Sequence, residues 1–358
     1  MTRTHQDADP TARRAVLDAE VAGQTFLSRW LDTVAAHADR VALRHDDGEG
    51  WVETTYGEVA DRVARAAAGL RALGVRPGDR VVLMMRNIPE FHVVDLAAVA
   101  CGATPVSVYN SSPPDQVAYL VGHSGARVAV VEDAGYLDRF TAVRDQLPAL
   151  EHVVLLRADG DAAPDGSGAL PATALTDHDA VDLHAALDLL TPETPATIIY
   201  TSGTTGPPKG VLITHRNVVW TAQAYLDLLD VDPVGFRAIS YLPMAHIAER
   251  MAGHYLAGMG GFEVTTCPEP SRIGPYAREV RPQTMFGVPR VWEKIHAGVQ
   301  AALAADAAIK ARFDEAVAAA EPIVERRTLG TATPEDEETW AFLDGVAFGK
   351  VRELAGLD

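Results

Sequence analysis

The sequence predicts an α/β fold built around mostly parallel β-sheet. Short Val-rich segments alternate with segments of helical periodicity, an order typical of strand–helix–strand units whose sheet is covered by helices on both faces. The composition agrees, since 47% of the 358 residues are hydrophobic and 22% are charged. That is enough apolar mass for two or three domains with cores of their own, and it excludes a disordered or fibrous protein.

Strand and helix segments can be followed along the first half of the chain. Thr55 and Glu58 have the spacing of a capping box, which predicts the start of a helix that Gly74 ends. The predicted elements are a helix at 24–37, a hairpin of strands at 41–45 and 51–56, the helix up to residue 74, a strand at 80–85, helices at 89–101, 113–123 and 135–147, and strands at 103–109, 126–132 and 152–157.

The second half predicts another α/β block followed by a helical tail. The predicted elements are strands at 196–200, 211–214, 238–243, 262–267 and 284–289, a helical tail at 291–327 and a last helix at 340–354. Residues 158–180 are rich in Ala, Asp, Gly and Pro without apolar periodicity, which indicates a surface linker or insertion. The predicted organisation is a loosely ordered segment 1–20, a first subdomain 21–157, the linker 158–180 and a second subdomain 181–358.

Charge and cysteine content exclude several classes of function. A formal net charge of −18 opposes non-specific attraction to nucleic acid or an anionic bilayer, so any anionic ligand must be held by local contacts. Cys101 and Cys267 lie far apart and show neither a disulfide framework nor metal-ligand spacing, which fits a reducing cytosol. The sequence shows no signal peptide and no apolar stretch long enough to span a bilayer. We therefore predict a cytoplasmic protein that binds no nucleic acid.

One segment, Tyr200-Thr-Ser-Gly-Thr-Thr-Gly-Pro-Pro-Lys-Gly210, has the chemistry of a phosphate-binding loop. Glycines let successive backbone N–H groups point into one concavity, and hydroxyls and an ammonium group add donors for an anion there. The residues predicted to bind nucleotide are Thr201, Ser202, Gly203, Thr204, Thr205, Gly206, Pro207, Pro208 and Lys209. The simplest alternative is an ordinary hairpin loop rich in Gly and Thr.

This loop does not match the Walker A pattern. Counted from Gly203, that pattern needs Gly where the chain has Pro208, and Ser or Thr where it has Gly210. The loop also leads from one predicted strand into another, so no helix N-terminus would face the phosphates. Binding must then depend on backbone donors, hydroxyls and Lys209, and a kinase or P-loop NTPase is disfavoured.

At these residues the chain resembles the AMP-forming adenylating superfamily, which includes acyl-CoA synthetases, firefly luciferase and the adenylation domains of peptide synthetases. YTSGTTGPPKG is similar to the family's signature. SYLPMAHIAER (240–250) resembles the next motif of long-chain fatty acyl-CoA synthetases, and GVPRVWEKI (287–295) resembles a third motif found mainly in long-chain and bubblegum-type members. The resemblance implies the N-terminal domain of an adenylating enzyme, with stacked, mostly parallel sheets flanked by helices.

The resemblance further implies a reaction in two steps. A fatty carboxylate attacks the α-phosphate of ATP to give acyl-adenylate and pyrophosphate, and the thiol of coenzyme A then displaces AMP. Lys209 and the loop hydroxyls would hold the β- and γ-phosphates, and Thr201 would reach the Mg²⁺ that bridges them. His246 would face the acyl and adenylate groups, the alternative being a packed helix-cap histidine.

Three residues of the third motif would lie on the acyl side of the site: Gly287, Val288 and Trp292. For Trp292 the alternative is a buried core aromatic residue. Glu249 and Arg250 are interpreted as a structural ion pair rather than as part of the chemistry. A substrate that partitions into lipid is compatible with transient contact with a membrane surface, although no basic amphipathic helix is evident.

Motifs that follow these in adenylating enzymes do not occur before Asp358: an aromatic-Gly-x-Thr-Glu segment, a Thr-Gly-Asp segment and a lid with a catalytic Lys. The chain is therefore interpreted as incomplete at its C-terminus. Because lid closure completes such a site, we expect residues 1–358 alone to have little or no ligase activity. Two alternatives stay open, an adenylating enzyme for another carboxylic acid and a catalytically silent fragment that binds ATP or an acyl group.

Overall fold

The structure is a computed structural model that describes residues 10–157, 166–201, 206–229 and 231–357. The chain divides into two compact units. Unit 1 consists of residues 1–236 and 240–270, and unit 2 consists of residues 237–239 and 271–358. Both sheets described below belong mainly to unit 1, whereas unit 2 is mainly helical.

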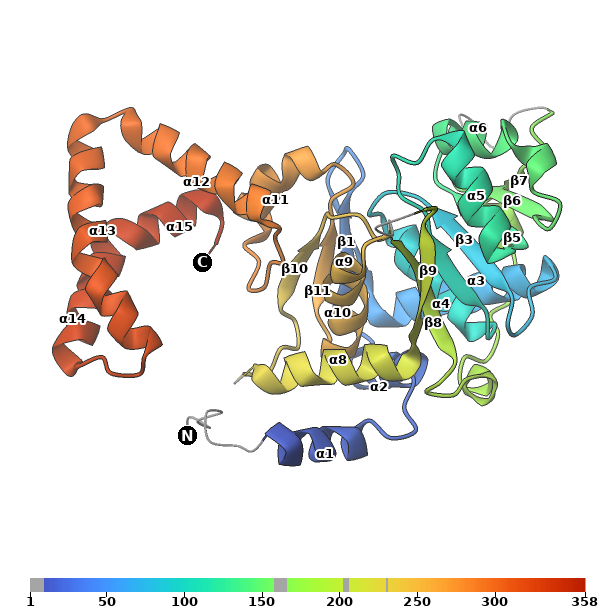
Figure 1. Cartoon of the computed structure of the whole chain (residues 1–358), viewed down its shortest axis with the longest axis horizontal. Coiled ribbons are helices and arrows are strands. Elements are labelled where there is room, and N and C mark those ends of the chain that lie inside the picture. Colours follow the sequence, from blue (N-terminus) through green and yellow to red (C-terminus); the bar gives the residue numbers. More distant parts are fainter. Residues whose placement is uncertain (1–9, 158–165, 202–205, 230, 358) are drawn as a thin grey trace. The chain divides into compact units, whose positions relative to one another are not determined.

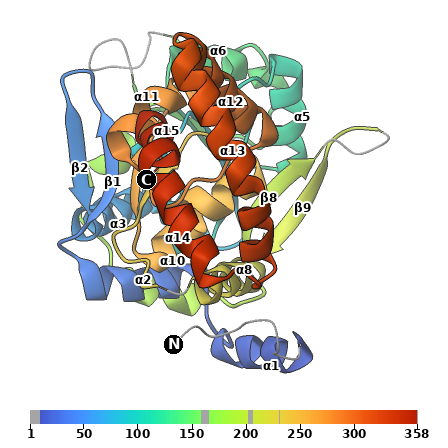
Figure 2. The ribbon, with the colours of Figure 1, turned by 90° about the vertical axis from the view of Figure 1, so that its left-hand side faces the viewer.

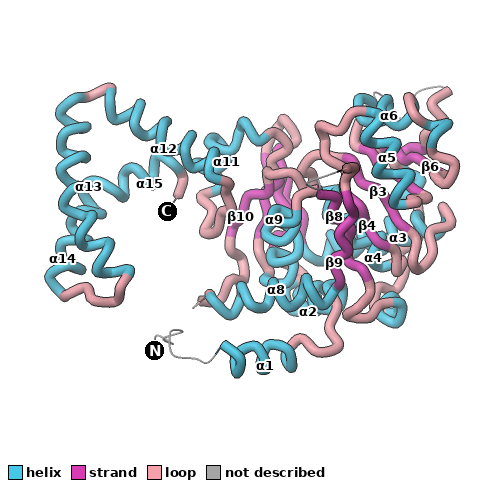
Figure 3. The backbone as a smooth tube through the Cα atoms, in the orientation of Figure 1, coloured by secondary structure: helices cyan, strands magenta, loops and turns pink. Residues whose placement is uncertain are grey.

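Unit 1 contains a seven-stranded sheet with strand order β7-β6-β5-β3-β4-β8-β9 (Figures 1 and 3). Its strands are β3 (Arg80–Met84), β4 (Thr104–Ser107), β5 (Val128–Val131), β6 (His152–Leu155), β7 (Leu170–Pro171), β8 (Pro195–Thr201) and β9 (Lys209–Thr214). Neighbouring strands are parallel except for β8 and β9, which are antiparallel. This arrangement confirms the predicted α/β class.

Helices cover both faces of this sheet, because successive side chains of its strands point to opposite faces and are apolar on both. Val82 and Met84 of β3 join the apolar core formed with α5 (Pro114–Ser124) and α6 (Ala134–Thr141). The alternate residues of β3 are also buried, and they point to the other face. There α4 (Pro89–Ala100) contacts β3, β4 and the first strand of the second sheet. Every residue of α4 except Glu90 is buried, because sheets lie on two of its sides.

The second sheet is built on the predicted hairpin. Strand β1 (Val41–Asp46) pairs antiparallel with β2 (Trp51–Thr55) and parallel with β11 (Glu263–Thr266). Strand β10 (Arg237–Ser240) spans the division between the units. The Thr55–Glu58 capping box is confirmed at the start of α3. The remaining helices of unit 1 are α1 (Pro10–Glu20), α2 (Phe26–His37), α3 (Tyr56–Ala72), α7 (Thr173–Thr176), α8 (His215–Leu228), α9 (Ile247–Glu249) and α10 (Ala257–Gly260), with a π-helical segment Arg250–Leu256 between α9 and α10.

A fully buried ion pair joins α4 to this π-helical segment. Asp95 and Arg250 are both 0% exposed and form a salt bridge. Arg250 also donates from Nη1 to Ser107 Oγ at 2.6 Å and from Nε to Tyr255 Oη at 2.8 Å. Burial opposes ionisation of Asp95, but interactions with Arg250 and His254 hold the pKa of its carboxyl below its usual value. The prediction that Arg250 pairs with Glu249 was therefore wrong. Arg250 pairs with Asp95, and Glu249 accepts a hydrogen bond from the backbone instead.

Two buried histidines extend this cluster. His254 Nε2 lies 3.0 Å from Asp95 Oδ1, and His254 Nδ1 lies 3.0 Å from His92 Nδ1. Burial lowers the pKa of both rings, so both are neutral. If His254 donates from Nε2 to Asp95, its Nδ1 must accept, and His92 must donate from Nδ1. The Asp95 carboxylate thus sets the tautomer of His254, and His254 in turn sets the tautomer of His92.

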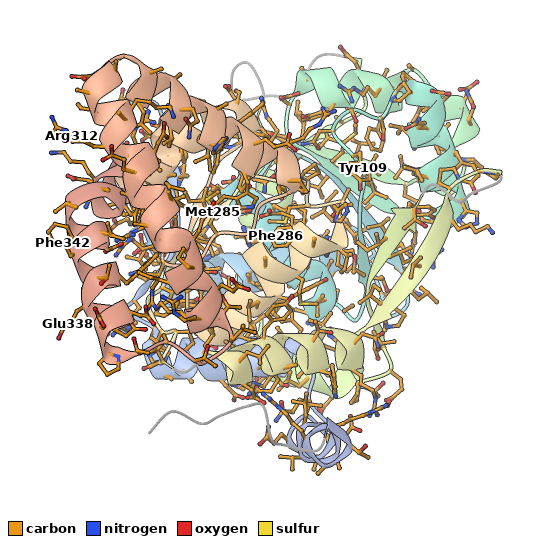
Figure 4. The ribbon with its side chains drawn as sticks, turned by 60° about the vertical axis from the view of Figure 1, so that its left-hand side comes forward. Tyr109, Met285, Phe286, Arg312, Glu338 and Phe342 are labelled. Atoms are coloured by element: carbon orange, nitrogen blue, oxygen red, sulfur yellow. The ribbon has the colours of Figure 1, made fainter. Side chains whose placement is uncertain are left out.

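Unit 2 is formed mainly by helices α11 (Ile273–Val280), α12 (Pro289–Ala304), α13 (Ala307–Thr328), α14 (Pro334–Leu343) and α15 (Gly349–Ala355). A small apolar cluster of Ala316, Ala320 and Leu343 joins α13 to α14. The capping box of Thr333 and Asp336 starts α14. Figure 4 shows Arg312 on α13 and Glu338 and Phe342 on α14, whose side chains are exposed.

The structure also differs from the sequence prediction at the first helix, at residues 284–289 and at the last helix. Residues 10–20 form α1, because Leu17 is buried and Asp18 accepts a hydrogen bond from Trp220 Nε1 of α8 at 2.9 Å. Residues 284–289 are not a strand: Thr284 makes an isolated bridge, and Pro289 begins α12, a position that suits its fixed φ. The last predicted helix is divided into α14 and α15 by a π-helical turn at Asp344–Phe348.

The predicted linker contains regular structure in its described part. Within 166–180 the chain forms β7, which pairs with β6, and α7, which packs on α3. Here Gly69 of α3 lies so close to α7 that an added Cβ would come within 2.5 Å of Leu175 Cα. The part at 158–165 lies outside the described residues, and the subdomain boundary at 158–180 stays a prediction.

We predict that Asp95→Asn destabilises unit 1 by about 3–5 kcal/mol, because it leaves the buried Arg250 guanidinium without a counter-charge. Urea unfolding followed by circular dichroism measures the change. The matched control is Glu193→Gln, which breaks the exposed pair of Glu193 with Arg216 and should cost no more than about 1 kcal/mol. Equal losses in the two variants would contradict a special role for the buried pair.

Candidate functional site

The predicted phosphate-binding loop connects the antiparallel strands β8 and β9, as Figure 2 shows. The strand register pairs Tyr200 with Gly210 and Thr201 with Lys209. This confirms that the loop leads from strand to strand rather than into a helix. Four of the predicted nucleotide-binding residues lie outside the described residues: Ser202, Gly203, Thr204 and Thr205. The described part of the site consists of two arms: the end of β8 at Thr201, and residues 206–209, which lead into β9.

Both arms present polar groups to solvent. Thr201 ends β8 and Lys209 begins β9, and both are exposed. Lys209 makes no ion pair with the described residues, so its ammonium group is available to an anion. Gly206 has φ +85°, a conformation that side chains rarely adopt. The arms thus offer a cation and a hydroxyl at neighbouring positions across the hairpin.

Close packing explains why residue 210 is glycine. A Cβ on Gly210 would lie 3.0 Å from Ile198 Cγ2 and 3.4 Å from the ring of Tyr200. A larger residue would require the Ile198 and Tyr200 side chains to shift by a few tenths of an ångström.

His246 is exposed and begins the short helix α9. Its Nδ1 accepts a hydrogen bond from the backbone N–H of Ala248 at 3.1 Å. In the neutral ring Nδ1 is then the acceptor, and Nε2 carries the proton. The helix-cap interpretation and the functional one are compatible, because capping uses one nitrogen and leaves Nε2–H for a ligand. No hydrogen bond links His246 to Lys209 among the described residues.

Glu249 is a buried carboxyl group three residues after His246, with 2% of its surface exposed. Its Oε2 accepts the backbone N–H of Leu242 at 3.2 Å. Asn87 Nδ2 donates to Ser240 Oγ at 2.8 Å and to the carbonyl of Leu242 at 2.9 Å. Burial raises the pKa of Glu249 to about 7, although hydrogen bonds from Ser240 and the backbone oppose the shift. Glu249 and Asn87 together hold the turn that leads to His246.

The third motif lies in unit 2. Trp292 is 41% exposed, which excludes the buried-core alternative. Its Nε1 donates to the carbonyl of Gly287 at 3.0 Å, and a Cβ on Gly287 would lie 2.8 Å from that nitrogen. Val288 is also exposed and is the N-cap residue of α12. These residues form one local surface, and their roles in acyl binding stay predictions.

Two absences apply to the described part of the chain. No group of three or more His, Cys, Asp or Glu side chains is arranged there to hold a metal ion. No helix in those ranges is long and apolar enough to cross a bilayer. Cys101 and Cys267 are buried, and no disulfide joins them.

Sequence reasoning missed several residues around the site. Asp95 carried a usable signal, because a carboxylate inside an otherwise apolar helix requires a buried partner. Asn87, Tyr119 and His123 carried none, since their contacts depend on which distant segments the fold brings together.

Comparison with known families decides the assignment. The AMP-binding enzyme family matches residues 30–354, which is most of the chain. The chain belongs to the AMP-binding enzyme family. This confirms the resemblance to AMP-forming adenylating enzymes that YTSGTTGPPKG indicated.

Curated members of the AMP-binding enzyme family include long-chain-fatty-acid–CoA ligases. Long-chain-fatty-acid–CoA ligase ACSBG2 of Xenopus laevis is 28% identical over 361 residues, which cover 98% of this chain and 49% of the relative. Long-chain-fatty-acid–CoA ligase FadD15 of Mycobacterium bovis is 33% identical over 252 residues, which cover 69% of this chain and 40% of the relative. The chain thus spans about half the length, or less, of these relatives.

Solved structures of other proteins share the fold of this chain. Anthranilate CoA ligase AuaEII, solved with anthranoyl-AMP, has a TM-score of 0.65 at 21% identity over 74% of this chain and 50% of that chain. The N-terminal domain of FACL13 from Mycobacterium tuberculosis has a TM-score of 0.58 at 24% identity over 75% of this chain and 64% of that chain. These neighbours share the α/β fold of this chain.

We predict that Glu249→Gln changes the pH dependence of stability. The folded protein holds a proton on Glu249 up to about pH 7, whereas the unfolded chain releases it near pH 4.5, the ordinary pKa of a glutamate side chain. As the pH rises between these values, the wild type should therefore lose about 1.4 kcal/mol of unfolding free energy per pH unit relative to the variant. Urea unfolding at several pH values from 4.5 to 8 measures this difference.

The control for this test is Glu338→Gln, which removes an exposed carboxyl group of α14. It should leave the unfolding free energy within about 0.5 kcal/mol of the wild-type value. If the difference in unfolding free energy between Glu249→Gln and wild type stayed constant across this pH range, burial would not raise the pKa of the Glu249 carboxyl group.

Proposed function

We propose that the protein serves the ATP-dependent activation of a long-chain fatty acid, first to acyl-adenylate and then to acyl-CoA. The observation that carries the proposal is the β8–β9 hairpin, whose arms present Thr201 and Lys209 to solvent on either side of a loop rich in Gly and Thr. Family membership supports AMP-forming chemistry. Because the chain spans about half of its relatives or less, this activity is proposed for the whole protein and not for residues 1–358 alone.

Lys209 is proposed to neutralise the β- and γ-phosphates while pyrophosphate leaves. The chemistry needs positioning and charge neutralisation more than a protein nucleophile. Loop hydroxyls and backbone N–H groups would add donors, and Thr201 would hold a Mg²⁺ ion bound together with ATP. Bound Mg²⁺ would supply positive charge to the departing pyrophosphate.

The carboxylate substrate is proposed to lie near His246, which can donate from Nε2 to an acyl or phosphate oxygen. Gly287, Val288 and Trp292 are proposed to line the acyl side. The names of the curated relatives support a long acyl chain, whereas the anthranoyl-AMP bound to AuaEII illustrates another acid class in the same fold. Coenzyme A is the proposed second substrate. Location in the cytoplasm, with transient contact with membrane surfaces, also stays a proposal.

We predict that Lys209→Ala weakens binding of Mg·ATP to the chain about 10- to 150-fold. This range corresponds to the loss of one charge-assisted contact of about 1.5–3 kcal/mol. Isothermal titration calorimetry measures the affinity, and single-turnover release of pyrophosphate in the intact enzyme measures adenylation, which should slow. The control is Lys350→Ala, an exposed lysine of α15.

Different outcomes separate the remaining alternatives. Unchanged ATP affinity and unchanged pyrophosphate release in Lys209→Ala would remove the proposed role of the loop. Pyrophosphate release stimulated by aryl acids instead of fatty acids would assign another acid class. ATP binding without any turnover in the intact enzyme would indicate a silent nucleotide-binding protein.

A further inference from the structure

We propose that Tyr119 and His123, on helix α5, are positioning residues that hold the two arms of the phosphate-binding hairpin in place. This inference rests on the proposed function, because it concerns the geometry in which the hairpin meets ATP. Neither side chain belongs to the loop or to the motifs that identify the family. Figure 2 shows α5 beside the hairpin formed by β8 and β9.

Tyr119 contacts the arm that leads into β9. Its hydroxyl donates to the carbonyl of Pro208 at 2.8 Å. Because the Pro208–Lys209 peptide is planar and trans, a carbonyl held toward α5 makes the N–H of Lys209 point the opposite way. The hydrogen bond therefore fixes the orientation of the backbone from which the Lys209 side chain extends.

His123 contacts the arm at the end of β8. Its Nδ1 lies 2.8 Å from Tyr200 Oη, and the two rings meet edge to face with centroids 5.7 Å apart. Tyr200 is 7% exposed and belongs to the core between the sheet and α5. Thr201, the proposed Mg²⁺ ligand, follows it directly. Each contact thus acts one residue before a group proposed to reach the phosphates or the metal.

The two positioning residues support each other. Tyr119 and His123 are four positions apart on one face of α5, and their rings stack with centroids 5.5 Å apart and planes inclined by 25°. The opposite side of α5 is fixed to the sheet by Val117, Leu120 and Val121, all buried. Tyr119 and His123 therefore belong to a helix whose position is fixed by packing in the apolar core.

The contacts control local orientation rather than the existence of the hairpin. Strands β8 and β9 pair from Pro195 and Thr214 up to Thr201 and Lys209, and this ladder remains when either side chain is cut back. What is lost is the restraint on the last residues before the loop. A helix behind the loop would supply such restraint in a P-loop protein; here it comes from α5, beside the hairpin.

The first experiment measures the hairpin without nucleotide. Trypsin cleaves after Lys209, so the rate of cleavage at Lys209–Gly210 reports how freely this arm moves. Tyr119→Phe, which removes only the hydroxyl, and His123→Ala should each raise this rate several-fold, while circular dichroism shows that each variant is still folded. Tyr225→Phe is the control, because Tyr225 is 55% exposed on α8. Cleavage at the wild-type rate in both test variants would overturn the proposal.

The second experiment measures Mg·ATP affinity in the same variants. Each should bind about 2- to 10-fold more weakly, as expected for one lost neutral hydrogen bond. His123→Asn places a polar atom near the position of Nδ1 and should restore most of the affinity lost in His123→Ala. In a Lys209→Ala background, Tyr119→Phe should have no further effect, because the group it orients is absent.

The two readouts distinguish the two proposals. A wild-type chain that binds no Mg·ATP would overturn the proposed binding of ATP by this hairpin, and the cleavage rate would then still decide whether Tyr119 and His123 hold the hairpin. Faster cleavage with unchanged ATP affinity would overturn the positioning role. Full additivity of Tyr119→Phe with Lys209→Ala would likewise overturn it, since it would mean that Tyr119 acts independently of Lys209.

Discussion

The buried charge pair of Asp95 and Arg250 is the constraint on which the rest of unit 1 depends. Neither residue has exposed surface, so each charge is acceptable only while the other is in place. The pair ties α4, which lies between two sheets, to the π-helical segment that directly follows α9. The turn carrying His246 is thereby attached to the sheet core, although His246 itself is exposed.

The site is organised by a change of strand direction. Six strands of the sheet run parallel, and β9 returns antiparallel beside β8. A parallel connection needs a crossover helix, which would put a helix N-terminus at the end of the strand, whereas a hairpin does not. The proposed phosphate-binding loop therefore connects two strand arms, and neighbouring side chains are proposed to set the orientation of those arms. Helix α5 lies where it can supply them.

Features that depend on near neighbours in sequence could be predicted, and features that depend on distant contacts could not. The capping box at Thr55, the hairpin of β1 and β2 and the return from β8 to β9 all follow from local pattern. The partner of Arg250 lies 155 residues away, and its neighbour Glu249 was the wrong choice because sequence proximity says nothing about which side of the backbone a buried charge faces. Helix α1 was missed for a similar reason, since its contact with Trp220 spans 202 residues.

Net charge explains why positioning matters so much in this protein. With a formal charge of −18, the average field repels a polyphosphate, and attraction has to come from groups within hydrogen-bonding distance. Contacts of that kind weaken steeply when a donor is misaligned. Lys209 is a single exposed cation on a strand arm, so its contribution depends on where its backbone points. An acidic protein that binds ATP through such a loop needs firm control of the loop's arms, and two aromatic side chains on a core-mounted helix provide it at the residues next to Thr201 and Lys209.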